Sequence, residues 1–507
     1  MTRVVIIGAG IGGLATANML AKAGYDVAIY EKNDQPGGHA GMMEIKGFRF
    51  DTGPSWYLMP EVFEHYFELF GKDVNKELDL VRLSPAYKVF FENESPVIVT
   101  SDEKRDAETF EKIEPGSGEK LLEYVARGDD IYQLALKHFL YTNFSSVRDF
   151  AKFDVVKRSH MMTKLAFTSI DKYVAKYVSE RRLRQILEYP MVFLGSSPFA
   201  APAIYSLMSA LDFREGVYYP KRGLYTIIES LTKLGRELGV EYHYASPAAR
   251  ITTANGRATG IDLADGTHCD ADIVISNADL HFTETRLLDK SDRSYPASYW
   301  NKREAGPSAL LMYLGVRGDL PELEHHNLFF VDDWKQNFES IFKTKTLPDP
   351  ASVYVCKPSA SDDSVAPKGS ENVFVLVPLP AGVSLAGKVL RDAAEKYLQL
   401  IEQKMNIKDL RKRIVVKELF GPNDFEEKYN AWQGTALGPS HLLSQSAMFR
   451  TPNVSKKVKG LYYVGGSTTP GIGLPMCLIG AELIYKRLAG DRLGGPVKKI
   501  HKLPEQQ

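Results

Sequence analysis

The chain has 507 residues, of which 44% are hydrophobic and 25% charged, and this composition is typical of a folded globular protein and not of a disordered one. The length exceeds what one hydrophobic core holds, about 250–300 residues, so we expect two or three lobes. Lys+Arg and Asp+Glu both number 63, and this balance gives no sign of a nucleic-acid partner.

The cysteines and the apolar runs indicate which cellular compartment the protein occupies. Cys269, Cys356 and Cys477 form neither a CxxC pair nor an even disulfide framework, which favours a reducing, cytoplasmic location and predicts no metal ligands. The first residues are typical of a strand and not of a signal peptide. The uncharged run 372–387 is short for a membrane span and contains two prolines, so no transmembrane helix is expected.

The N-terminal residues carry the strongest local pattern. Residues 3–9 predict a buried strand, residues 12–23 a helix with small side chains on one side, and residues 26–31 a second strand. This strand–helix–strand order is typical of a doubly wound α/β fold with a parallel sheet. The turn between the first strand and the helix contains Gly8, Gly10, Gly12 and Gly13.

These glycines match the GxGxxG spacing of a dinucleotide-binding turn. Gly8 permits the tight turn, Gly10 lets the backbone approach a pyrophosphate, and Gly13 lets helix and strand pack closely. The helix N-terminus offers free N–H groups and a favourable dipole to phosphates. Glu31 ends the second strand, where a carboxylate can accept hydrogen bonds from ribose hydroxyls and disfavours a 2′-phosphate. The turn predicts NAD or FAD and does not by itself distinguish them.

The rest of the chain predicts further elements of both kinds. Helices are expected at 116–140, 147–190, 223–238 and 387–405, and strands at 308–316, 372–379 and 460–467. After the last strand, a Gly/Pro turn leads into a helix that has Leu474 and Pro475 in its first turn. The final residues, 491–507, are expected as a flexible tail.

Several segments resemble known families. Residues 31–41, with Glu31, Lys32 and the run PGGHAG, and residues 50–54, FDTGP, resemble the extended N-terminal signature of flavin amine oxidases and carotenoid desaturases. Residues 460–482, GLYYVGGSTTPGIGLPMCLIGAE, resemble the C-terminal motif of bacterial-type carotenoid desaturases, the phytoene desaturases, which in that family closes over the flavin. Shorter matches extend the resemblance along most of the chain. One departure is Arg222, which stands where the family often has glycine.

The resemblance implies one FAD and an α/β fold with a discontinuous Rossmann-type FAD-binding domain, a sheet-based substrate domain and a helical, membrane-docking insertion. The residues expected to contact FAD are Gly8, Gly10, Gly12, Gly13, Glu31, Lys32, Gly37, Gly38, His39, Gly53, Pro54, Gly466, Gly473, Leu474, Pro475 and Met476. The expected boundaries are 1–85, 216–300 and 421–490 for FAD binding, 86–140 and 301–420 for the substrate domain, 141–215 for the helical membrane and substrate-access region, and 491–507 for the tail.

The resemblance also implies a reaction, the stepwise dehydrogenation of a long polyisoprenoid, phytoene or a similar molecule, towards lycopene or a related conjugated carotene. One hydrogen leaves as hydride to the flavin and the other as a proton, and a quinone or oxygen takes the electrons. The candidates to line an apolar channel, which could equally be core residues, are Phe199, Tyr205, Tyr218, Tyr219 and Met448. Asp149, with Arg148 beside it, is the candidate acid or base, although an Arg–Asp pair is also common at a protein surface.

Residues 157–184 favour contact with a membrane surface. They hold eight Lys or Arg against Asp171 and Glu180. The interleaved apolar and aromatic residues are Met161, Met162, Leu165, Phe167, Tyr173 and Tyr177. This mixture suits docking on anionic lipid, and it also suits a solvated basic face. Because phytoene dissolves in bilayers, we expect a cytoplasmic protein that associates peripherally with the membrane.

Other functions share parts of these motifs. Related carotenoid enzymes include diapophytoene desaturases, oxygenases or ketolases, and saturases. A flavin-binding escort protein would carry prenylated cargo and catalyse nothing, and a flavin amine oxidase would share only the N-terminal signature. The flavin signatures near both ends of the chain favour an enzyme over an escort protein.

Overall fold

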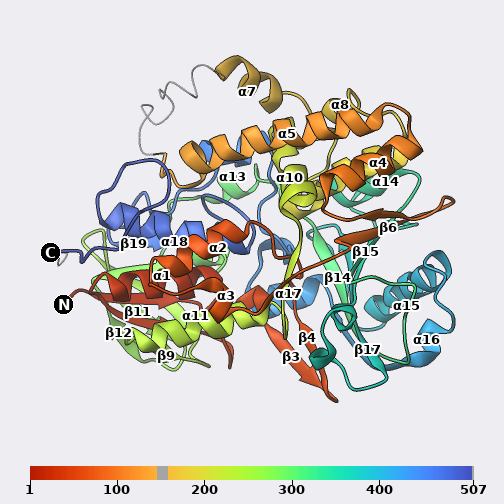
Figure 1. The fold of residues 1–507 in the computed structure, drawn as a ribbon. Helices are drawn as coiled ribbons and strands as arrows, with labels where there is room; N and C mark the ends of the chain where they lie inside the picture. Colours follow the sequence, from red (N-terminus) through yellow and green to blue (C-terminus); the bar gives the residue numbers. More distant parts are fainter. Residues whose placement is uncertain (145–157, 505–507) are drawn as a thin grey trace.

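The computed structural model describes residues 1–144 and 158–504 (Figure 1). It consists of a five-stranded parallel sheet with its helices, a seven-stranded mixed sheet, and a group of helices at the top of the view in Figure 1. The candidate pair Arg148 and Asp149 lies outside the described residues.

The five-stranded sheet brings together distant parts of the chain. In spatial order its strands are β19 (Leu461–Tyr463), β13 (Ile273–Ser276), β1 (Arg3–Ile7), β2 (Asp26–Tyr30) and β9 (Glu241–His243). All four neighbouring pairs are parallel. The strand–helix–strand prediction is confirmed, because α1 (Ile11–Lys22) connects β1 to β2.

Different layers cover the two faces of this sheet. On one face, α1 packs against α11 (Tyr225–Glu237) and α18 (Leu474–Leu488). On the other face, Val5 and Ile7 share a buried cluster with residues of the antiparallel sheet formed by β10 (Ala248–Ala254), β11 (Arg257–Leu263) and β12 (His268–Asp270). Successive residues of a strand point to opposite faces of the sheet. A strand that is buried on both faces therefore needs an unbroken apolar run, and β1 has one.

The seven-stranded sheet forms the second lobe. Its order is β18 (Ile414–Phe420), β14 (Ser308–Arg317), β17 (Ser370–Leu379), β16 (Val353–Cys356), β15 (His326–Phe330), β6 (Tyr87–Phe91) and β7 (Val97–Val99). Alternate residues of β14 divide between two cores. Leu310 and Met312 lie with the buried residues of α15 (Gly387–Lys404), whereas Leu311 and Tyr313 face the main core. The strands predicted at 308–316 and 372–379 are confirmed as β14 and β17, whose long apolar runs suit strands that are covered on both faces.

The remaining elements connect and cover the two lobes. The short strand pairs are β3 (Met42–Ile45) with β4 (Phe48–Asp51), and β5 (Leu80–Arg82) with β8 (Tyr218–Pro220). The main helices of the upper layer are α4 (Glu103–Ile113), α5 (Ser117–Ala135), α7 (Ser159–Ala166), α8 (Ile170–Val174), α9 (Arg181–Glu188) and α10 (Leu207–Ala210). The other α-helices are α2 (Pro60–Glu68), α3 (Val74–Glu77), α12 (Leu280–Phe282), α13 (Ala297–Trp300), α14 (Trp334–Glu339), α16 (Leu410–Arg413) and α17 (Pro422–Tyr429). Within the described ranges, no helix is both long enough and apolar enough to cross a membrane.

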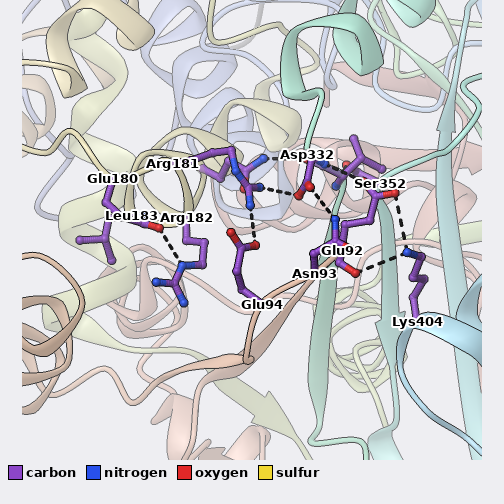
Figure 2. Close-up of polar contacts among 12 residues, drawn as sticks. Glu92, Asn93, Glu94, Glu180, Arg181, Arg182, Leu183, Asp332, Ser352 and Lys404 are labelled. Carbon is purple, nitrogen blue, oxygen red and sulfur yellow. Dashed lines mark hydrogen bonds and ion pairs between the residues drawn. The ribbon is translucent and has the colours of Figure 1, made fainter.

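A polar network fastens α9 to the edge of the seven-stranded sheet (Figure 2). Arg181 pairs with Asp332 at 2.8 Å and with Glu94, in the turn between β6 and β7, at 2.5 Å. The backbone N–H of Asp332 donates to Glu92, and Lys404 of α15 lies 3.7 Å from the same carboxylate. These pairs orient the helical layer on the sheet, although exposed ion pairs add little free energy each.

The C-terminal segment differs from the predicted flexible tail. Val497 and Ile500 are buried in the main core, the backbone N–H of Leu503 donates to the carbonyl oxygen of Ala23, and that of His501 donates to the hydroxyl of Tyr485. Two isolated apolar residues show no periodicity, so the sequence alone gives no signal for this packing.

Candidate functional site

The turn after β1 forms one wall of a large cavity. Gly8 has φ +96° and its N–H donates to the carbonyl oxygen of Tyr30 at 2.8 Å, which joins the turn to β2. Gly8, Gly10 and Gly12 line the cavity. Gly13 does not, because it faces the strand, where a Cβ would lie 2.2 Å from the carbonyl oxygen of Gly8. The turn and the N-terminus of α1 therefore offer backbone N–H groups to a phosphate.

Glu31 holds the shape of this turn. Its Oε2 accepts the N–H of Ala9 at 2.7 Å, and its Oε1 accepts the backbone N–H of Asn33 at 2.9 Å. The side chain is buried yet borders the cavity, where the predicted ribose contact would form. Lys32 also borders the cavity, and its Nζ donates to the carbonyl oxygen of Glu427.

A second glycine segment lies against the first. Gly37, with φ +121°, donates its N–H to the carbonyl oxygen of Ala9 at 2.9 Å. His39 faces the cavity, with Nδ1 3.2 Å from the carbonyl oxygen of Ala436 and its ring 4.3 Å from that of Tyr429. The ring is exposed to the cavity but has protein around it, and this enclosure lowers the pKa of His39 to about 4, so the imidazole is neutral near pH 7. Gly38, Gly53 and Pro54 line the same wall, and a Cβ at Gly53 would lie 2.3 Å from the carbonyl oxygen of His39.

The loop between β19 and α18 supplies the third part of the wall. Gly466, Gly473, Leu474, Pro475 and Met476 all border the cavity, and Gly473 caps α18 with φ +116°. The three glycine-rich segments thus meet, as their motifs predict. Two helix N-termini, those of α1 and α18, point at one space. This backbone-rich wall, with Glu31 beside it, fits the pyrophosphate and ribose of a flavin dinucleotide.

Motif reasoning missed Asn277, which lines the cavity, and Arg450, which contacts the wall without lining the cavity. Arg450 is 4% exposed, and it donates from Nε to Thr468 at 3.0 Å and from Nη2 to the carbonyl oxygen of Gly466. It therefore fixes the loop before α18. Burial lowers the pKa of Arg450 to about 10. Asn277, directly after β13, lies close to the glycine turn. A Cβ at Gly10 would be 2.8 Å from its side-chain amide, and a Cβ at Gly12 would be 2.7 Å from it. Both residues lie in short segments that resemble the carotenoid desaturases, and this resemblance was the only sign of their role in the sequence.

The cavity continues from this wall into an apolar arm. Its volume is about 950 Å³, at the upper end of the usual range for small-molecule sites. Large side chains that line the arm are Trp56, Tyr189, Phe193, Phe330, Trp334, Phe338 and Tyr354. The space is therefore continuous from the glycine segments to a surface that offers mainly dispersion and hydrophobic contacts.

The predicted channel residues divide into two groups. Tyr205 and Met448 line the cavity. Phe199, Tyr218 and Tyr219 lie outside its wall. Phe199 packs behind it on Phe338, with ring centroids 6.2 Å apart. Tyr218 and Tyr219 belong to β8, whose pairing with β5 commits them to core contacts, and the Tyr219 hydroxyl donates to Asp362.

Arg222 keeps the conformation that glycine would adopt at its position. Its φ is +69°, its N–H donates to Asp362 at 2.6 Å, and its carbonyl oxygen accepts from Arg49 at 2.7 Å. The departure from the family pattern thus leaves the backbone in the left-handed region. A residue with a Cβ pays about 1–2 kcal/mol for that conformation, which the two hydrogen bonds help to offset.

Comparison with known proteins identifies relatives over the whole length. The sequence model of the flavin containing amine oxidoreductase family matches residues 11–482. The chain is 43% identical to the carotenoid 3,4-desaturase of Haloarcula japonica, over 96% of this chain and 98% of that protein. It is 35% identical to the zeta-carotene-forming phytoene desaturase of Myxococcus xanthus, over 96% and 93%. An oxidoreductase from Methanosarcina mazei has the same fold, with a TM-score of 0.60 and 17% identity over 96% of this chain and 100% of that one.

The family match includes every strand of the five-stranded sheet except β1 and extends into α18. Both enzymes named above are more than 30% identical over more than nine-tenths of each chain. The expectation of FAD agrees with the family and with the wall of backbone N–H groups. The chain therefore belongs to the flavin containing amine oxidoreductase family and, within it, to the FAD-dependent carotenoid desaturases.

Proposed function

We propose that this chain dehydrogenates carbon–carbon single bonds of a long polyisoprenoid, phytoene or a more conjugated carotenoid. The observation that carries the proposal is one continuous cavity, with glycine-rich backbone at one wall and an apolar arm beyond it. A water-insoluble chain gains free energy from burial in such an arm, because apolar surface leaves water. The same cavity gives the cofactor and the reacting bond a common, dry space.

FAD, when bound, supplies a two-electron acceptor. Each dehydrogenation removes one hydrogen as hydride and one as a proton and leaves one new C=C bond. A quinone or oxygen would then take the two electrons. The predicted FAD-contacting residues that line the cavity would hold the cofactor, and Gly13 would act indirectly, by letting α1 approach β1. Asp149, with Arg148, stays our proposed acid or base.

A second substrate is favoured by the comparison. The identity of 43% to a carotenoid 3,4-desaturase exceeds the 35% to a phytoene desaturase. We therefore propose, as the alternative reaction, desaturation at the 3,4-bond of a carotenoid that is already conjugated. The two reactions use the same chemistry and differ in which part of the substrate lies at the cofactor wall.

We further propose that substrate reaches the cavity from a membrane surface on the cytoplasmic side. Met162 and Ala166 of α7 line the cavity, as do Met448 and Phe449. Met448 and Phe449 are 47% and 53% exposed, and Phe167, directly after α7, is 78% exposed. Apolar side chains that both border a cavity and face solvent suit a mouth that opens onto lipid.

The test is an anaerobic assay with purified flavoprotein, a quinone, and liposomes that carry either phytoene or lycopene. We expect new absorption bands in the visible region, and chromatography of the products to count the double bonds formed. Asp149→Asn is assayed in parallel, with Asp154→Asn as a control that makes the same change five residues further along the chain. We expect only Asp149→Asn to lose turnover while keeping its FAD.

The outcomes separate the proposals. Phytoene conversion supports the first reaction, and conversion of lycopene alone supports the 3,4-desaturation. Oxygenated products formed only in air would identify an oxygenase and contradict both. If neither carotenoid reacts while the protein holds FAD, the proposed substrates are wrong. Unchanged turnover in Asp149→Asn would remove Asp149 from the mechanism.

A further inference from the structure

Three potential metal-binding side chains converge in the seven-stranded sheet, behind the cavity wall. His325, His326 and Cys356 are all buried, and one ligand atom from each lies within 4.8 Å of the others. The imidazole of His326 stacks on Trp56, which lines the cavity, with ring centroids 4.3 Å apart. The proposed reaction uses none of the three.

The register of two strands produces this cluster. His326 of β15 lies directly opposite Cys356 of β16 in an antiparallel pair, so their side chains share one face of the sheet. His325 precedes β15, where its carbonyl oxygen accepts the N–H of Lys357 at 2.7 Å. Because His325 lies outside the strand, its side chain does not have to point to the face opposite that of His326. Its ring centroid lies 4.5 Å from that of His326.

Hydrogen bonds orient both imidazoles and leave one nitrogen of each without a partner. His325 Nδ1 lies 3.0 Å from the Ser361 hydroxyl, and His326 Nδ1 lies 2.7 Å from the Tyr354 hydroxyl. The Tyr354 hydroxyl donates to Ser55, so it accepts from His326, and this leaves a lone pair on His326 Nε2. The Nε2 atoms of both histidines are buried without any hydrogen-bond partner. Buried polar atoms are rarely left in that state.

We propose that His325, His326 and Cys356 bind one Cu⁺ ion. Imidazole nitrogen and thiolate sulfur are ligands that Cu⁺ accepts, and a second hydrogen bond at the far ring nitrogen is the usual arrangement around a ligating histidine. Ligand atoms at about 2.0–2.3 Å from one ion lie roughly 3.5–4 Å apart, so the side chains need to move inward by less than about 1 Å.

The choice of a monovalent ion follows from burial. On binding, the Cys356 thiol loses its proton to solvent, and thiolate plus Cu⁺ leave no net charge at the site. Zn²⁺ would leave one uncompensated positive charge in the interior beside Lys357, and desolvating a charge is costly.

The experiment titrates the purified flavoprotein with Cu⁺ under anaerobic, reducing conditions, against a chromophoric Cu⁺ chelator. We expect one Cu⁺ per chain. Cys356→Ser should weaken binding by more than about 100-fold, and Tyr354→Phe, which removes the partner of His326, by roughly 10–100-fold. Cys269→Ser, on the exposed strand β12, is the matched control and should bind as the wild type does.

X-ray absorption of the loaded wild type gives an independent reading that needs no variant to fold. One sulfur and two nitrogen neighbours would support the site. The proposal is overturned if the chelator keeps all the Cu⁺, if the absorption spectrum lacks the sulfur neighbour, or if a folded Cys356→Ser protein binds as tightly as wild type. Equimolar Zn²⁺ that displaces the Cu⁺ would contradict the charge argument.

Discussion

At the scale of single residues, Asp212 links the stability of the protein to pH. Its Oδ2 accepts hydrogen bonds from Tyr87 at 2.9 Å and from Tyr189 at 2.6 Å, and the residue is 1% exposed. Burial raises the pKa of Asp212 from 3.8 to about 7, with a smaller contribution from the charge of Asp106. Between these two values the folded state holds a proton that the unfolded state has released. Stability from this group is therefore complete below about pH 4 and is lost as the pH rises to 7.

Asp212→Asn should remove this dependence on pH. The amide carries no charge, and its oxygen can accept both tyrosine hydroxyls. We expect the free energy of unfolding of the variant to exceed that of the wild type by about 2–4 kcal/mol at pH 8. At pH 4 the two free energies should differ little. Urea denaturation at several pH values measures this. Asp270→Asn, at a 96% exposed side chain, is the control, and parallel curves for Asp212→Asn and wild type would contradict the expectation.

The contacts at the cofactor wall show which residues a sequence can reveal. The spacing of Gly8, Gly10 and Gly13 predicted their place, because the turn they form is local. Arg450 and Asn277 could not be assigned in that way. Asn277 meets the turn across the sheet, 269 residues along the chain from Gly8. Contacts of this kind depend on strand order, which a single sequence does not contain.

At the scale of elements, α7 and α8 have less surface for membrane docking than predicted. Leu165, Tyr173 and Tyr177 are buried, and the two tyrosine hydroxyls lie 3.1 Å apart. The arginines at positions 158, 181, 182 and 184 pair with acidic residues. The remaining apolar contact is centred on Phe167. The composition of this segment can be read from the chain, but the helical face that each side chain occupies depends on packing against α5 and α9.

Lys172 and Lys176 are exposed and test the docking of this region. We expect the double variant Lys172→Glu, Lys176→Glu to bind anionic liposomes at least about tenfold more weakly, because each cation near such a surface contributes about 1 kcal/mol. High salt should weaken the wild type in the same way. Lys388→Glu with Lys412→Glu makes the same charge change on the other lobe and serves as the control. Liposome sedimentation that shows neither effect would rule out this docking surface.

At the scale of the whole molecule, the two ends of the described chain complete one domain. The segment after α18 lies against α1, and Ile500 is 5% exposed. We expect Ile500→Ala to lower the free energy of unfolding by about 2–4 kcal/mol, because it leaves a cavity in the core. Leu493→Ala, at a side chain that is 76% exposed, should cost less than about 0.5 kcal/mol. Thermal unfolding of the two variants measures this, and equal midpoints would mean that the segment adds no stability.

The discontinuous sheet also has a consequence for how the protein is made. β1 and its neighbour β2 are synthesised early, but β9, β13 and β19, which complete the sheet, follow only at residues 241, 273 and 461. At about 5–20 residues per second, the ribosome needs roughly 20–90 s to pass from β1 to β19. During that time the apolar run Val4–Ile7 has no completed sheet to join. Flavin capture must therefore follow translation of α18, and a chaperone that shields β1 until then would raise the yield of holoenzyme.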